Sequence, residues 1–83
     1  MSSARAVSFE NRDRYIEIGL NIAYYRKKMG MNQEQLAEKA CMSRSHLGAI
    51  EAPNIIRTFS LELLLDIANV LQIEPSKLLE HRA

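Results

Sequence analysis

Residues 32–51 read NQEQLAEKACMSRSHLGAIE, a stretch with two short helical patterns separated by a break. Asn32 is a favourable helix N-cap, and Gln35 follows at the position that closes a capping box. The spacing of the next apolar residues predicts a helix over residues 33–40. The side chains expected on its inner face are Leu36, Ala37 and Ala40.

A second helix is predicted to begin after the N-cap Ser43, which follows a break of two residues. It ends near Glu51, because Pro53 disfavours helix in the residue before it and lacks a backbone N–H. Its inward side chains are Leu47 and Ile50. Two short helices joined by such a turn form a helix-turn-helix, and the small Ala37 lets them cross closely.

Three more helices are predicted outside this motif. One covers residues 12–28 and stops before Gly30, one covers residues 61–71 behind a serine N-cap, and a short one covers residues 75–80. Gly19, inside the first, is typical of a close approach by another element. The inward side chains are Tyr15, Ile18, Ile22, Leu61, Leu64, Ile67, Ala68, Leu71, Leu78 and Leu79. No segment alternates as a strand, so an all-α fold of five helices is expected.

The composition indicates one small globular domain. The chain has 83 residues, of which 47% are hydrophobic and 25% are charged. We expect a flexible N-terminal tail at residues 1–11 and a folded domain at residues 12–83. A single cysteine excludes an internal disulfide, so packed apolar side chains alone must hold the core, including Met29, Met31 and Met42. No signal peptide or bilayer-spanning run is evident, and a cytoplasmic protein is expected.

No catalytic or metal-binding set is visible in the sequence. There is no Gly-rich phosphate loop and no Ser-His-Asp candidate, so an enzyme is not expected. His46 and His81 lie far apart, with no cysteine or histidine at ligand spacing. No metal and no cofactor are therefore expected, and Cys41 is interpreted as a buried or half-buried small apolar residue.

The net charge of +1 does not by itself indicate a partner. Residues 1–57 carry nine basic and six acidic side chains, whereas residues 58–83 carry two basic and four acidic ones. The basic residues are thus concentrated in the first two-thirds of the chain. A solvated surface of mixed charge explains this distribution almost as well as a nucleic-acid partner does.

An ordered set of motifs gives the sequence a family resemblance. Ile-x-x-x-Arg ends at Arg26, Asn-Gln-x-x-Leu-Ala begins at Asn32, and a serine-capped helix ends in Ile-Glu at Glu51. Leu-x-x-Ile-Ala-x-x-Leu and Pro-Ser-x-Leu-Leu follow. Over residues 18–79 the chain resembles the lambda-repressor-like domain of the Cro and phage-repressor type, also called the xenobiotic-response-element family. The resemblance implies binding to double-stranded DNA.

In this family the third helix lies in the DNA major groove with its N-terminal residues at the base edges. The resemblance therefore implies base contacts from Ser43, Arg44, Ser45, Gly48 and Ala49. Arg44 is the strongest candidate, because its guanidinium can donate two hydrogen bonds to one guanine. Implied phosphate contacts are Asn32, Gln33, His46, Arg57 and Thr58, where His46 faces either a phosphate or solvent.

The resemblance also implies an ion pair between Arg26 and Glu51 that ties the third helix to the scaffold. The sequence departs from the family at Cys41, where glycine is usual. If the backbone is left-handed at this position, a side chain adds strain of about 1 kcal/mol.

The function that this resemblance implies is sequence-specific transcriptional regulation, with repression expected. We expect a homodimer on a palindromic operator, formed by helices four and five and the loop before them. Apolar residues that the core does not need are candidates for its interface: Ile55, Ile56, Leu63, Leu65 and Val70. The alternative is a protein-interaction module, such as an antitoxin-like or anti-repressor component. DNA binding should weaken steeply with salt, whereas an apolar protein contact should not.

Overall fold

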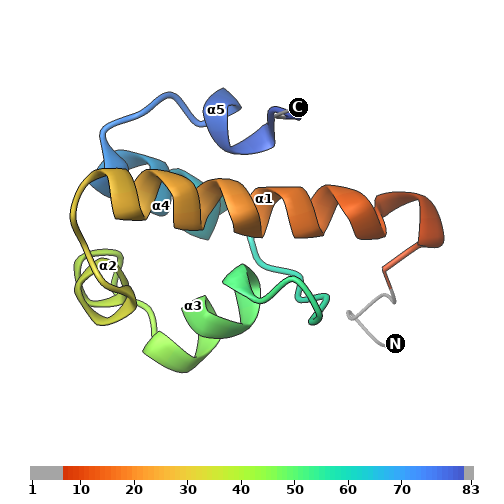
Figure 1. The fold of residues 1–83 in the computed structure, drawn as a ribbon, viewed down its shortest axis with the longest axis horizontal. Coiled ribbons are helices and arrows are strands. Elements are labelled where there is room, and N and C mark those ends of the chain that lie inside the picture. The colour runs from red at the N-terminus through yellow and green to blue at the C-terminus, as the bar shows by residue number, and fades with distance from the viewer. Residues whose placement is uncertain (1–6, 82–83) are drawn as a thin grey trace.

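The computed structural model describes residues 7–81 and contains five helices and no strand within that range. They are α1 (Phe9–Lys28), α2 (Gln33–Lys39), α3 (Arg44–Glu51), α4 (Leu61–Leu71) and α5 (Ser76–Leu79). The long α1 runs through the middle of the molecule (Figure 1), with α2 and α3 on one side of it and α5 on the other. The predicted all-α fold of five helices is confirmed.

Three of the helices begin at the residues that the sequence predicts, because polar side chains cap them. The Asn32 side chain accepts a hydrogen bond from Gln35 N at 2.8 Å, and the Gln35 side chain accepts one from Asn32 N in return. The Ser43 hydroxyl accepts from His46 N at 3.0 Å, and the Ser60 hydroxyl does the same for α4. Each cap satisfies a backbone N–H that has no partner inside its helix.

The first helix begins three residues earlier than predicted, at Phe9 instead of Arg12. Ser8, a residue type that favours the N-cap, occupies that position, but its side chain makes no capping hydrogen bond. Glu10 in the first turn has a charge that favours a helix N-terminus. The Phe9 side chain is 86% exposed. Of the predicted flexible tail, residues 1–6 lie outside the described residues.

The core lies between α1 and the other helices. Its fully buried large side chains are Ile22, Leu36, Leu47, Ile67, Leu71 and Leu78. Three residues predicted to pack inward are exposed instead: Leu61, Leu79 and Met29. Leu61 is the first residue of α4 and Leu79 the last of α5, so both lie where a helix leaves the core.

Two contacts fix the position of α3 against α1 and α2. A Cβ built on Gly19 of α1 would lie 2.0 Å from the carbonyl oxygen of Ile50, so only glycine fits this close approach. Ala37 is buried where α2 meets α3, and its carbonyl accepts from Met42 N at 2.9 Å. Both small residues were predicted to permit close packing, and both do so.

The turn between α2 and α3 is left-handed at Cys41, the position where the family usually has glycine. Cys41 has φ of 56°, a conformation that glycine adopts without steric cost. The Cys41 side chain is exposed, which corrects the expectation that it is buried or half-buried. Within the described residues, no helix combines the length and the apolar character needed to cross a membrane.

Candidate nucleic-acid interface

The residues predicted to contact bases lie along α3 and at its cap. Ser43, Arg44 and Ser45 are exposed, and Gly48 and Ala49 are half-exposed one turn further along. Leu47, Ile50 and Glu51 face the interior of the protein. The outer face of α3 thus carries small side chains and one long cation, Arg44.

Arg44 is the first residue of α3. Among the described residues no hydrogen-bond or ion-pair partner holds its guanidinium, which leaves the donors available to a ligand. Its planar group presents two parallel N–H donors that match guanine O6 and N7 in the major groove. The position and the chemistry therefore suit direct base readout.

A buried ion pair holds the C-terminal end of α3. Arg26 Nε and Nη2 donate to the two carboxylate oxygens of Glu51, each at 2.8 Å. Arg26 is 8% exposed and Glu51 is 7% exposed. The remaining nitrogen, Nη1, donates to the carbonyl of Met31 at 2.8 Å, just before α2. The predicted pair is present, and it joins α1, α3 and the approach to α2.

Two residues predicted to contact phosphate lie at the start of α2: the N-cap Asn32 and the first helical residue, Gln33. Asn32 uses its side-chain oxygen and its backbone N–H in the capping box, so only its side-chain amide group can donate to a phosphate. Gln33 Nε2 donates to Glu51 Oε1 at 2.9 Å, a contact that the sequence did not predict. No local pattern marks it, because the two residues are 18 positions apart and meet only in the folded chain.

The other predicted phosphate contacts lie on α3 and in the loop that follows it. Arg57, in the loop after α3, approaches His46 of that helix, with Nη1 3.3 Å from Nδ1. Thr58 follows in the loop, and both loop residues are exposed. Because a guanidinium only donates, His46 Nδ1 accepts at this contact, and the other Arg57 nitrogens and His46 Nε2–H remain as donors beside α3.

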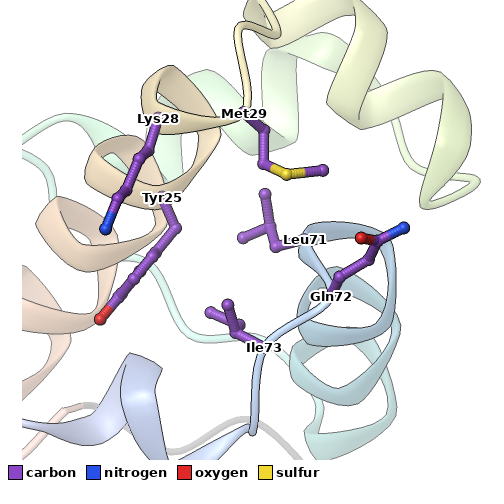
Figure 2. Close-up of a pocket in the computed structure, with 6 residues that line it drawn as sticks. All are labelled: Tyr25, Lys28, Met29, Leu71, Gln72 and Ile73. Atoms are coloured by element: carbon purple, nitrogen blue, oxygen red, sulfur yellow. The ribbon is translucent and has the colours of Figure 1, made fainter.

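A pocket of about 350 Å³ lies elsewhere, at the C-terminal ends of α1 and α4 (Figure 2). It is lined by Tyr25, Lys28, Met29, Leu71, Gln72 and Ile73, none of which belongs to α2 or α3. In the close-up the Met29, Leu71 and Ile73 side chains turn toward one another. The predicted contact residues lie outside it. Among the described residues, no three His, Cys, Asp or Glu side chains are grouped to hold a metal ion.

The fold and the exposed face of α3 define a helix-turn-helix domain of the kind found in transcriptional regulators. The chain belongs to the helix-turn-helix family, which matches residues 22–78. The resemblance to Cro and phage repressors is confirmed.

Two similar proteins are, by name, a transcriptional regulator and a controller protein. Over 65 residues the chain is 35% identical to the HTH-type transcriptional regulator SinR of Bacillus subtilis (strain 168), covering 78% of this chain and 58% of SinR. It therefore spans less than two thirds of that relative. The fold is similar to the crystal structure of the restriction-modification controller protein C.AhdI from Aeromonas hydrophila, with a TM-score of 0.71 and 33% identity. That match covers 77% of this chain and 94% of C.AhdI.

Proposed function

We propose that the protein is a sequence-specific DNA-binding transcriptional regulator of the cytoplasm, acting as a repressor. One observation carries the proposal: α3 is locked at its C-terminal end by the Arg26–Glu51 pair while Arg44 at its start is exposed. A reading helix must be held rigidly and present its donors to the groove, and this arrangement supplies both. The relation to SinR, a transcriptional regulator, supports the same conclusion.

Two duplexes define the experiments. The selected duplex is the one that the wild-type protein enriches from a pool of random-sequence duplexes, and the scrambled duplex has the same base composition in shuffled order. Sequence-specific binding requires that the protein prefer the selected duplex.

Arg44→Ala is expected to lose discrimination between the selected and scrambled duplexes. The loss should be about 1–3 kcal/mol, the contribution of one bidentate contact to guanine. Fluorescence anisotropy on both duplexes measures it. Arg57→Ala is the matched control, because loss of a phosphate contact weakens both duplexes alike and lowers the salt slope by about 1. An Arg44→Ala protein with unchanged discrimination would remove α3 from the role of reading helix.

We propose further that the protein binds a palindromic operator as a homodimer, with half-sites about 34 Å apart. Among the proposed interface residues, Leu63, Leu65 and Val70 are half-buried, as is Ile56, whereas Ile55 is 42% exposed. Leu61, the first residue of α4, is 68% exposed and adds a second accessible aliphatic side chain. The interface therefore depends most on Ile55 and Leu61.

The double variant Ile55→Glu/Leu61→Glu is expected to be a folded monomer. Two buried carboxylates would have to lose water at the interface, and they would repel their symmetry mates. Sedimentation velocity should show a dimer for the wild-type protein and a monomer for the variant, with unchanged circular dichroism. A wild-type protein that stays monomeric at high concentration contradicts the proposed dimer.

The second candidate is a protein-interaction module of the antitoxin or anti-repressor kind. It is favoured by the short side chains of Ser45, Gly48 and Ala49, which offer few long groups for reading bases. Binding of such a partner through apolar contacts would change little across a salt series, unlike binding to phosphates.

A further inference from the structure

The Gln33 side chain crosses from the start of α2 to the end of α3. Gln33 is the first residue of α2, and its Nε2 donates to Oε1 of Glu51, the last residue of α3, at 2.9 Å. On the way it lies against α3, because a Cβ built on Gly48 would be 3.5 Å from Gln33 Oε1. The side chain is half-buried and directed at the recognition helix.

The acceptor of this bond is held in place. The Glu51 carboxylate receives two hydrogen bonds from Arg26, and Arg26 is itself anchored on the Met31 carbonyl. A planar guanidinium that engages both carboxylate oxygens fixes the orientation of the carboxylate. Gln33 therefore joins the start of α2 to a carboxylate whose orientation Arg26 fixes.

We propose that Gln33 is a positioning residue, which sets where α3 lies relative to the start of α2 and thereby controls base readout. The inference rests on the proposed function. It differs from the phosphate-clamp role that the family resemblance implies for Gln33, because the observed hydrogen bond goes to Glu51 within the protein, while the second Nε2 hydrogen stays available to a phosphate.

The two roles have different consequences on DNA. Loss of a phosphate contact weakens binding to every duplex, because the phosphate backbone is the same in all of them. Loss of a positioning bond weakens only the duplex whose bases require α3 in its correct place. The ratio of the two affinities separates these roles, and a purely structural role would leave that ratio unchanged in a folded protein.

The test is Gln33→Met, which keeps the length of the side chain and removes its donor and acceptor. Anisotropy is measured on the selected and scrambled duplexes, at a temperature where circular dichroism shows every variant to be folded. Affinity for the selected duplex is expected to fall about tenfold, as for a lost hydrogen bond to a charged group. Affinity for the scrambled duplex is expected to change by less than about twofold, because the phosphate contacts of the other residues remain.

Gln35→Met is the matched control. It removes a second glutamine from the first turn of α2, but Gln35 is exposed and bonds to the backbone N–H of Asn32. Its discrimination should equal that of the wild-type protein. Gln33→Met/Arg44→Ala should lose less discrimination than the sum of the two single changes, because Gln33 acts in part through the placement of Arg44.

Equal loss on both duplexes leaves discrimination unchanged and would overturn the inference in favour of a direct phosphate contact. Unchanged affinity for both duplexes in Gln33→Met would also overturn it. A wild-type protein with no preference for the selected duplex would overturn the proposed function and this inference together. Because that result is measured on the wild-type protein alone, a failure of the proposed function can be told apart from a failure of the inference, which is measured on Gln33→Met.

Discussion

Arg26→Met is expected to destabilise the folded protein by about 3–5 kcal/mol, the cost of removing one partner from a buried ion pair. The change leaves the Glu51 carboxylate 7% exposed and without the two hydrogen bonds from Arg26. It also removes the donor that satisfies the Met31 carbonyl. A small domain has about 5–15 kcal/mol of stability in total, so much of it would be lost. Urea unfolding followed by circular dichroism measures the effect.

Lys27→Met is the matched control for this substitution. Lys27 is the adjacent cation in the last turn of α1, and its side chain is exposed. Its replacement should cost no more than about 0.5 kcal/mol, as is usual for surface positions. Arg26→Met/Glu51→Met should recover most of the stability lost by Arg26→Met, because a buried pair can be replaced by apolar groups at little cost. Equal stability of Arg26→Met and Lys27→Met would show that the pair does not anchor α3.

Gly19→Ala is the second substitution expected to have a large effect. The new Cβ would lie 2.0 Å from the carbonyl oxygen of Ile50 and 3.1 Å from its carbonyl carbon. Both atoms belong to the backbone of α3, so no side chain can rotate out of the way and the two helices must separate. We expect a loss of about 3 kcal/mol, the upper range for overpacking, despite a gain of about 1 kcal/mol in helix propensity.

Gly48→Ala provides the comparison for Gly19→Ala. Gly48 also lies inside a helix, but a Cβ there would be 3.5 Å from Gln33 Oε1, which is an ordinary contact. Its stability should stay the same or rise, because alanine is the better helix former. Urea unfolding of both variants separates the steric effect from the propensity effect. A Gly19→Ala protein as stable as Gly48→Ala would mean that α1 and α3 are not packed as closely as described.

The sequence predicted the features that depend on local chemistry. The N-caps Asn32, Ser43 and Ser60 were predicted because each residue type bonds to the backbone a few positions further on. A close approach of another element to Gly19 was predicted. Its partner, the Ile50 carbonyl, was not, because it comes from a distant part of the chain. The start of α1 was placed too late because Phe9 is an isolated apolar residue that the structure leaves exposed, so no apolar periodicity marks the first turn.

Burial and long-range polar contacts were harder to predict. In α4 the run Leu-Glu-Leu-Leu-Leu at residues 61–65 offers apolar side chains on several faces, so periodicity alone could not show that Leu61 is exposed. The Arg26–Glu51 pair was predicted only from the family resemblance. The bond of Gln33 to Glu51 and the approach of Arg57 to His46 join separate elements, so nothing in the local sequence indicates them.

The proposed reading of DNA by α3 is tested most directly by the affinity of the wild-type protein for the selected and scrambled duplexes across a salt series. Specific binding should exceed non-specific binding by about a thousandfold or more. Both affinities should fall steeply with salt, by a slope of about 0.9 for each phosphate contacted. Equal affinity for the two duplexes, or binding that does not change with salt, would contradict sequence-specific recognition of DNA by this domain.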